Sequence, residues 1–594
     1  MRKVLDRLST GLTLMLIAVV PASAALAAPD TALPPPSSPP SATAAPTAPS
    51  PAPIVDIDAG ISDALRSLVS GGQVARLMPR NAERATATAY YKAHNFAPIW
   101  IKDSALTPRA EAVISRLKNA AADGLDPADY PIPGFNGDAA ALAQDDVRLT
   151  RSVLDYARHL ETGRIAPARV FSDIDYGVRA PDPAILLSDI MSSSDVNATF
   201  ESFNPPTAGF HALKDKLAAL RAAASAEVTR DDRIPNGPTL HPGMRDPRVP
   251  ALRAKLGLHA RNPNDTTYDM RAARAVATLQ RHARLRADGA LDARTLAVIN
   301  GPVAIPASKQ IDIVTANMER WRWLPHDLGR DYVMVNIPDY SLRVVRDGRE
   351  VWHTKIVAGR PQTPTPLLTA SMDTVIVNPS WHVPQSIIQN EYLPRYASDP
   401  RIFERLGLEV KRSPDGHISV VQPPGAANAL GRIKFNFPNR FQVYLHDTPD
   451  KRLFASDKRA FSHGCMRVED PTKFGEIILS MATPAPTPAA RDIVKLFGHE
   501  EHTFTLTNRP TVHLTYQTAF VDESGKLQLR DDLYGFDARI HDILGSDERK
   551  VADITPPRDP GRALGSDKGY QEILRRVERR EAQNPLQFFE RISR

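Results

Sequence analysis

Residues 461–468 read Phe-Ser-His-Gly-Cys-Met-Arg-Val, and the rest of the 594-residue chain can be interpreted around this stretch. It holds Cys465, the only cysteine of the sequence, which therefore cannot form an internal disulfide. A second histidine, His446, ends the alternating segment 441–446, and fifteen residues separate it from Ser462. A thiol, an imidazole from a neighbouring segment and a glycine beside the thiol are typical of an acyl-transfer site. The alternative for a lone cysteine is an inert, buried apolar side chain.

Cys465 can act as a nucleophile only as a thiolate, and His446 is the candidate general base. Tyr444 and His446 are two residues apart in a predicted strand, so both face the same side. No acidic residue is placed in the sequence to orient His446, but the backbone carbonyl of Asp447 can do so.

Two further residues of the motif, Gly464 and Arg467, are candidates for substrate binding. Gly464 lets the backbone approach a substrate carbonyl closely, and the N–H groups around Gly464 and Cys465 can donate to an oxyanion. Arg467 lies two residues after the cysteine and can pair with a substrate carboxylate.

A metal site is the competing interpretation, with His446, His463 and Cys465 as three zinc ligands. The sequence contains neither an H-E-x-x-H helix nor a C-x-x-C pair. We therefore predict no metal and no other cofactor.

The amino-terminal region predicts export. Residues 1–28 combine a basic start, a short apolar run (LTLMLIAVV) and small residues, which is the pattern of a signal peptide. Residues 29–56 are rich in Pro and Ala and predict an extended linker. No later stretch has about 20 consecutive apolar residues, so we expect no membrane span in the mature protein and a periplasmic location. An uncleaved amino-terminal anchor is the alternative.

The remaining chain divides into three predicted domains and a tail. Helical periodicity over 57–240 predicts a scaffold without chemistry of its own. Residues 241–305 predict three short helices, with Asp292 as a helix cap. Strand patterns dominate 310–545, with a hairpin at Asp347-Gly348 and an insertion over 384–431 that mixes helical and Pro/Gly-rich pieces. Residues 546–594 are charged and predict a solvated tail. The fold class is thus multidomain α+β, with a mainly β catalytic domain.

The net charge of the chain does not identify a binding partner. The formal net charge is +6 and the isoelectric point about 9.2, which suits an anionic neighbourhood or reflects ordinary surface bias. No basic block or interleaving of basic and aromatic residues indicates nucleic acid, so we predict no nucleic-acid partner.

The segments SHGCMRV and YLHDTP together resemble the signature of the YkuD-type L,D-transpeptidase family: a histidine followed at short distance by S/T-H-G-C. The stretches 357–366 (VAGRPQTPTP) and 378–387 (NPSWHVPQSI) agree with this resemblance. Residues 241–305 resemble the three-helix peptidoglycan-binding module, and the whole resembles the long periplasmic branch of the family. Many members carry asparagine where this chain has Arg467.

The resemblance implies roles for the site residues. Cys465 would be the nucleophile and His446 its base, while His463, Gly464 and Tyr444, with Ser462 beside them, would surround the oxyanion. Insertion 384–431 would be a capping subdomain. Candidate substrate contacts are Trp381, Tyr444 and Arg467.

The resemblance also implies a reaction. The thiol would attack the third residue of a tetrapeptide stem, release D-alanine and form a thioester. A neighbouring stem would then capture the thioester in a 3-3 cross-link, with peptidoglycan stems and other wall synthases as partners. Water, a free D-amino acid or a lysine of a wall-anchored protein are alternative acceptors. A non-catalytic, wall-binding scaffold is the alternative of another class.

Overall fold

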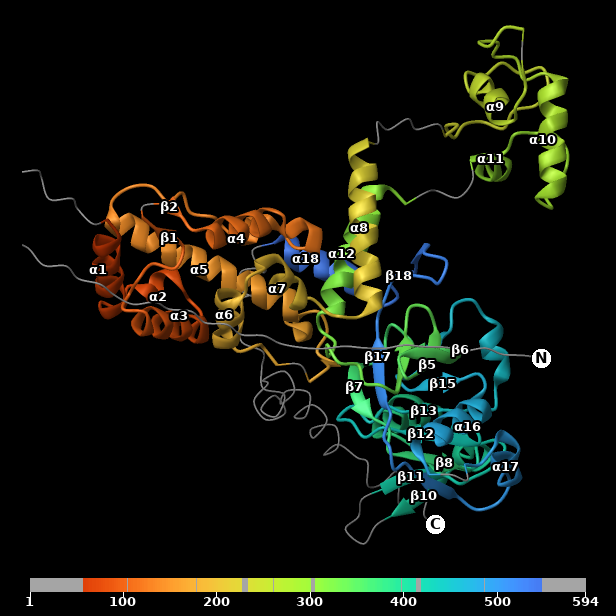
Figure 1. Cartoon of the computed structure of the whole chain (residues 1–594). Coiled ribbons are helices and arrows are strands. Elements are labelled where there is room, and N and C mark those ends of the chain that lie inside the picture. Colours follow the sequence, from red (N-terminus) through yellow and green to blue (C-terminus); the bar gives the residue numbers. More distant parts are fainter. Residues whose placement is uncertain are drawn as a thin grey trace, which may run out of the picture. The chain divides into compact units, whose positions relative to one another are not determined.

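The computed structural model describes residues 57–546, apart from Ser104, Val178, 227–232, Ala260, 301–304, Ala397, 413–417 and 485–486 (Figure 1). The predicted signal peptide 1–28, the linker 29–56 and all but the first residue of the tail 546–594 lie outside the described residues. Within the described part, no helix has both the length and the apolar character that crossing a membrane requires.

The amino-terminal helical region is built around α5 (Ala139–Thr162). Residues on nearly every face of α5, such as Val147, Val153 and Leu160, are buried because five other helices contact it. Asp138 caps its start by accepting a hydrogen bond from the N–H of Ala141 at 2.9 Å. The other elements are α1 (Ile57–Ser70), α2 (Val74–Leu77), α3 (Asn81–Ala93), β1 (Ile101–Lys102), β2 (Ala105–Leu106), α4 (Pro108–Lys118), η1 (Ala120–Asp123), η2 (Pro127–Asp129), η3 (Pro167–Arg169), α6 (Pro183–Ser192) and α7 (Val196–Ser202).

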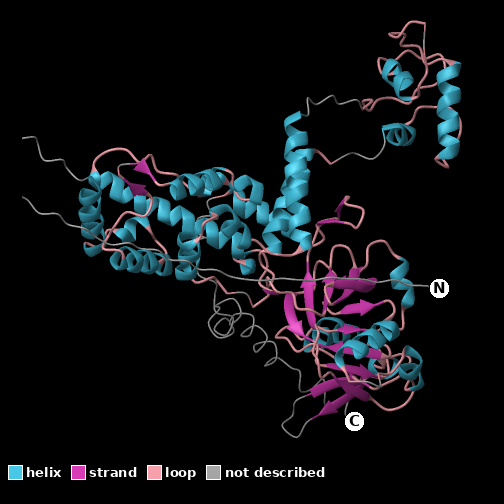
Figure 2. Ribbon diagram, viewed as in Figure 1, coloured by secondary structure: helices cyan, strands magenta, loops and turns pink. Residues whose placement is uncertain are grey.

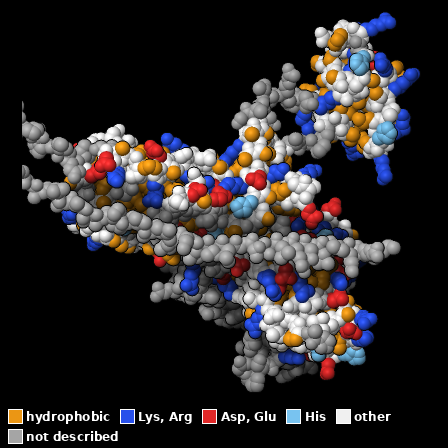
Figure 3. All heavy atoms as spheres, in the orientation of Figure 1, with side chains coloured by type: hydrophobic (Ala, Val, Ile, Leu, Met, Phe, Trp, Pro, Cys, Tyr) orange, Lys and Arg blue, Asp and Glu red, His pale blue; other side chains and the backbone are white. Residues whose placement is uncertain are grey.

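Three helices form a small unit with its own core: α9 (Val249–Lys255), α10 (Met270–His282) and α11 (Ala293–Asn300). As predicted, Asp292 caps α11 by accepting from the N–H of Thr295 at 2.7 Å. Gly289 has φ +70°, and a Cβ there would lie 2.8 Å from the carbonyl oxygen of Ala273, so the turn requires glycine. Residues 241–305 contain eleven Lys and Arg against five Asp and Glu, and Figure 3 shows basic side chains over this unit.

The carboxy-terminal region contains one long, mixed sheet with the order β16-β8-β12-β13-β15-β6-β5-β4-β17-β7-β3, where β14 also pairs with β6 (Figure 2). The predicted hairpin at Asp347-Gly348 is present, and both residues have positive φ, as its tight turn requires. The strands are β3 (Ile174–Asp175), β4 (Tyr332–Asn336), β5 (Ser341–Arg346), β6 (Arg349–Gly359), β7 (Leu367–Ser371), β8 (Thr374–Val377), β12 (Ile433–Asn436), β13 (Leu445–His446), β14 (Ala460–Ser462), β15 (Met466–Val468), β16 (His502–Thr505) and β17 (Thr511–Thr515).

Helices and a short hairpin complete this region. α16 packs Phe474 and Ile478 against the sheet and begins at an Asp470 cap followed by Pro471, as predicted. The elements are α8 (Ala208–Ala226), α12 (Ala307–Trp321), η5 (Lys451–Ala455), α16 (Pro471–Ala482), α17 (Ala490–Lys495), α18 (Phe536–Gly545), β18 (Ala519–Val521) and β19 (Leu527–Leu529).

The core of the sheet also includes residues from the amino-terminal half. Phe210 and Leu217 of α8 belong to it, and β3 pairs with β7. From the sequence alone, these residues are expected in a separate scaffold domain, 57–240. The structure shows that part of this range packs with the sheet, because its buried apolar side chains find their partners there.

The insertion 384–431 has a small core of its own, which includes Trp381, Phe403 and Val420. Besides the predicted helical pieces it contains two paired strands, 409–412 and 418–422, and the second of them also pairs with β9, just before the insertion. Its elements are β9 (Trp381–His382), α13 (Gln385–Ile387), η4 (Ile388–Tyr392), α14 (Leu393–Tyr396), α15 (Ile402–Arg405), β10 (Glu409–Arg412) and β11 (Ile418–Gln422). The predicted fold class, multidomain α+β with a mainly β domain beside a helical scaffold, is confirmed.

Candidate active site

The cysteine loop runs from Ser462, at the end of β14, to Met466, at the start of β15. Gly464 has φ +115°, a conformation that other residues rarely adopt. Hydroxyl groups of the neighbouring 357–366 stretch hold the loop: Thr365 Oγ1 donates to the carbonyl of Gly464 at 2.8 Å, and Thr363 Oγ1 to that of Ser462 at 3.1 Å. This stretch, noted in the sequence for its family resemblance, therefore supports the loop physically.

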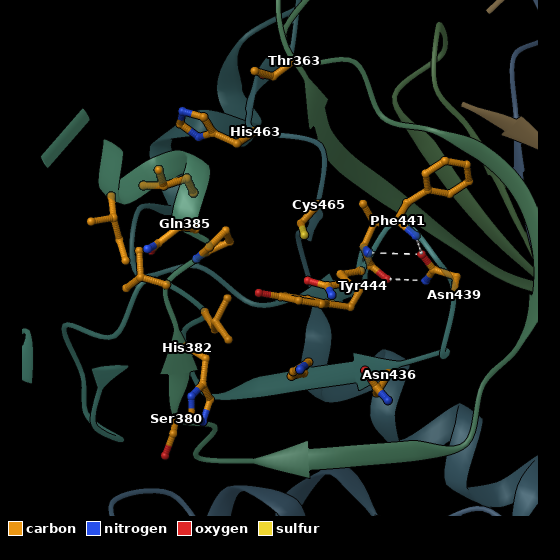
Figure 4. Close-up of a pocket in the computed structure, with 18 of the residues that line it drawn as sticks. Thr363, Ser380, His382, Gln385, Asn436, Asn439, Phe441, Tyr444, His463 and Cys465 are labelled. Carbon is orange, nitrogen blue, oxygen red and sulfur yellow. Dashed lines mark hydrogen bonds between the residues drawn. The ribbon is translucent and has the colours of Figure 1, made fainter. Parts of the chain in front are cut away.

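Cys465 is half-buried and lines a cavity of about 850 Å³. Figure 4 shows it with the ring of Tyr444 alongside, His463 and Thr363 toward one end of the pocket, and His382 and Ser380 toward the other. Burial raises the pKa of the Cys465 thiol, while hydrogen bonds from the backbone and the hydroxyl of Tyr444 act in the opposite direction. Tyr444 thus favours the thiolate, although burial has the larger effect.

Tyr444 connects the cysteine to the core of the insertion 384–431. Burial raises the pKa of its hydroxyl well above the ordinary value, so the group is a permanent O–H donor at neutral pH. The indole of Trp381 acts to lower this pKa, and Cys465 acts to raise it, so both side chains lie close to the hydroxyl. Trp381 itself is only 8% exposed and packs in the core of the insertion. It holds Tyr444 in place, and its direct contact with substrate stays a prediction.

His446 is 5% exposed. Its Nδ1 lies 2.5 Å from the carbonyl oxygen of Asp447, the contact proposed from the sequence. Because a carbonyl only accepts, Nδ1 carries the proton of the neutral ring, and the backbone of Leu430 is a second hydrogen-bond partner of the imidazole. Burial, then the charges of Arg467 and Lys434, lower the pKa of the imidazole to about 3, so it is neutral at physiological pH.

No hydrogen bond joins His446 to Cys465 among the contacts of the described residues. The two rings of Tyr444 and His446 meet edge to face, with centroids 5.8 Å apart. Tyr444 lines the cavity together with Cys465, and His446 does not. Catalytic hydrogen bonds are often loose without substrate, so this geometry keeps His446 as a candidate base.

Strand register places two cations beside His446. Lys434 of β12 lies opposite His446, which lies opposite Arg467 of β15, so the three form one row on the same face of the sheet. Arg467 does not line the cavity, and its Nε is buried without a partner among the described residues. Its contact with a substrate carboxylate stays a prediction.

Lys434 was not found by sequence reasoning. Its Nζ lies 4.2 Å from the centre of the Tyr444 ring, it lines the cavity, and burial lowers the pKa of its ammonium group. In the part of the chain that the structure describes, it forms no hydrogen bond or ion pair. The sequence shows only a lysine in a short strand, and its place beside the thiol depends on the pairing of β12 with β13.

A second charged group at the cavity comes from the insertion. Glu391, in η4, contacts Nε2 of His463, and Arg360 contacts both of them. The sequence predicts His463 as a site residue, but it predicts neither Glu391 nor Arg360. The residues lie far apart in the sequence, and only the folding of the insertion over the loop brings them together.

The two N–H groups expected to donate to an oxyanion, those of Gly464 and Cys465, have different hydrogen-bond partners in the structure. The N–H of Gly464 donates to the hydroxyl of Ser462 at 3.2 Å, a long bond that a substrate oxyanion can replace. No partner for the Cys465 N–H is found among the described residues. The latter is therefore the better placed oxyanion donor.

The zinc interpretation receives no support from this geometry. Among the described residues, no group of three or more His, Cys, Asp or Glu side chains is arranged to hold a metal ion. His446 is engaged with a backbone carbonyl and His463 with Glu391, so the two histidines are directed to different partners.

Comparisons with known proteins agree with the motif. Residues 330–485 match the family model of the L,D-transpeptidase catalytic domain (YkuD), and residues 85–217 match a model described as a scaffold domain. A Haemophilus influenzae protein named "Putative L,D-transpeptidase" is 31% identical over an alignment of 261 residues, and the match covers 40% of this chain and 52% of that protein. The chain thus matches about half the length of this relative.

Two solved structures are similar at low scores. An L,D-transpeptidase from Mycobacterium smegmatis is 14% identical with a TM-score of 0.16, covering 31% of this chain and 58% of that one. L,D-transpeptidase 3 from Mycobacterium tuberculosis is 14% identical with a TM-score of 0.16, covering 31% and 61%. At such scores these likenesses support no further conclusion.

Proposed function

We propose that this chain, which carries an L,D-transpeptidase catalytic domain at residues 330–485, cross-links peptidoglycan stem peptides through a thioester on Cys465. One observation carries the proposal. The sulfur of Cys465 lies in a cavity that residues of the insertion also line, next to Tyr444, whose backbone and hydroxyl donors act to lower the pKa of the thiol. A thiol in a cavity beside such donors suits nucleophilic attack on a bound carbonyl.

The first step is acylation. The Cys465 thiol transfers its proton toward the neutral His446, and the sulfur attacks the carbonyl of the third stem residue. The Cys465 N–H donates to the oxygen as negative charge develops there, and Lys434 and Arg467 add positive charge nearby. His446 then gives its proton to the departing amine of D-alanine, leaving a thioester and a neutral imidazole.

The second step is transfer. The amine of a neighbouring stem attacks the thioester, forms the amide of a 3-3 cross-link and restores the thiol. The bond formed is of the same kind as the bond broken, so the reaction needs no nucleotide. A cap that limits water favours the amine over hydrolysis.

The rest of the chain supports a wall enzyme. The excess of basic residues over 241–305 suits an anionic polymer, and we propose that this unit binds peptidoglycan. Export to the periplasm by residues 1–28 and association with other wall synthases complete the proposal.

Product analysis of the mature protein with disaccharide-tetrapeptide, joined to intact-mass measurement, tests the proposal. We expect a cross-linked dimer, free D-alanine and a transient acyl adduct on Cys465. Tripeptide alone would instead indicate a carboxypeptidase. No adduct and no product from folded protein would indicate a wall-binding scaffold without catalysis.

A further inference from the structure

The proton transfers of the acylation step proposed above do not use one charged cluster at the cavity: Glu391 of the insertion, His463 of the cysteine loop, and Arg360 after β6. Oε1 of Glu391 contacts Nε2 of His463 and lies 3.4 Å from Nη2 of Arg360. Nη2 of Arg360 also contacts Nε2 of His463. All three residues line the same cavity as Cys465.

This arrangement accommodates either protonation state of His463. With a proton on Nε2, the imidazole donates to the carboxylate of Glu391. Without it, Nε2 accepts from the guanidinium of Arg360. The side chains are 31%, 28% and 40% exposed for His463, Glu391 and Arg360, so a proton taken up here can leave to solvent.

The second half of the reaction needs such a group. An alkyl amine has a pKa of about 10 and arrives as an ammonium ion, which has no lone pair. One proton must leave before the amine attacks the thioester, and a second must leave when the amide forms. His446 does not line the cavity, whereas Glu391 and His463 do, so this pair meets the arriving ammonium group first.

We propose that Glu391 and His463 bind the ammonium group of the acyl acceptor and remove its first proton. This inference rests on the proposed function and assigns the acceptor side of the same cavity. Glu391 attracts the ammonium, and Nε2 of His463 receives one proton, which passes to solvent. Arg360 is a positioning residue that holds the carboxylate.

The free amine attacks the thioester carbonyl, the new C–N bond forms and the C–S bond breaks. The second amine proton passes to the sulfur of Cys465 by way of His446. One amide and one thiol result, and one proton has been released to solvent.

The Glu391→Gln variant tests this inference, because it removes the charge at nearly constant shape. Glu404→Gln is the matched control, an exposed carboxylate on the same insertion. Each protein is given a tetrapeptide donor with one of two acceptors: a stem-peptide amine, or hydroxylamine, which is mainly unprotonated at neutral pH. Released D-alanine, amide and hydroxamate are measured separately.

We expect Glu391→Gln to release D-alanine in the first turnover at the rate of the unchanged protein, which also shows that it is folded. Amide formation with the stem amine should fall about tenfold or more at pH 7 and recover toward pH 9, where free amine is more abundant. Hydroxamate formation should stay within about twofold, because hydroxylamine needs no base. Glu404→Gln should match the unchanged protein throughout.

Equal losses with both acceptors would overturn the inference, since they would mean that Glu391 only shapes the cavity. Unchanged amide formation would overturn it as well. Faster hydrolysis of the thioester with no selective loss of amide would identify the cluster as a latch of the insertion instead. If the unchanged protein releases no D-alanine, the proposed function itself fails, and this outcome is distinct from the others.

Discussion

The scaffold and the catalytic domain each bury a polar network, and the two networks differ in how completely their hydrogen bonds are satisfied. In the scaffold, the fully buried carboxylate of Asp146 accepts from the hydroxyl of Tyr91 at 2.7 Å and from the backbone N–H groups of Ile99 and Trp100 at 3.0 and 2.8 Å. Thr150 accepts from the Trp100 indole at 2.9 Å. Every member has a partner within the chain.

The catalytic domain leaves polar groups available. Arg467 Nε has no partner among the described residues, and the same holds for the Lys434 ammonium and the Cys465 N–H. Unsatisfied polar groups are unfavourable in a folded protein unless a ligand pairs with them. A buried charge alone therefore does not mark a functional site. The satisfied network around Asp146 is structural, whereas the unpaired polar groups around Cys465 can bind a ligand.

The largest expected effect follows from removing the sulfur. Cys465→Ala should abolish both D-alanine release and cross-linking, since no other thiol exists in the chain. The far-UV circular dichroism spectrum should be unchanged, because the side chain is small and only half-buried. Residual cross-linking by this variant would contradict the assignment of Cys465 as the nucleophile.

The second prediction concerns Asp146 in the scaffold, whose hydrogen bonds are all satisfied. Asp146→Ala leaves three buried donors without an acceptor and should lower the free energy of unfolding by about 3–5 kcal/mol. Calorimetry measures this loss. The alkylation rate of Cys465 in the folded protein should not change, and a slowed rate would mean that the two networks are coupled.

The two networks should respond to pH with opposite signs. The pKa of His446 is lowered to about 3, so its contribution to stability is present above pH 6.5 and is lost as pH falls from there toward 3. The expected loss between pH 7 and pH 5 is about 2 kcal/mol. Burial raises the pKa of Asp146 to about 6, so its protonation stabilises the fold by about 1 kcal/mol over the same interval.

Calorimetry of His446→Asn and Asp146→Asn at both pH values separates these contributions. The former variant should lose less stability on acidification than the unchanged protein, and the latter should lose more. Parallel pH dependences in all three proteins would contradict the environments assigned to both groups.

The smallest expected effect concerns Lys434. Its positive charge lowers the pKa of the Cys465 thiol, so Lys434→Met should move the midpoint of alkylation to higher pH by up to about one unit. The exposed Lys526→Met is the control, and it should not move the midpoint. No shift in either variant would leave Tyr444 as the main stabiliser of the thiolate.

Local sequence signals predicted local structure well. The Asp347-Gly348 hairpin, the Asp292 cap and the helix after Asp470-Pro471 all depend on residues close in the chain, and all are present. The strands β10 and β11 were not predicted, because they are stabilised by pairing with each other and with β9 rather than by a distinctive local pattern.

By itself, the sequence determined which reactive groups the chain carries: a single thiol in the Ser-His-Gly-Cys motif and a histidine upstream. It also determined the family resemblance that implies their roles. Only the tertiary structure decided which residues surround the sulfur. Strand register brought Lys434 and Arg467 to either side of His446, and the folded insertion brought Glu391 to His463. The physical reason is that motifs are set by covalent neighbours, whereas the electrostatics of a site depends on groups that meet only when distant strands pair and the core closes.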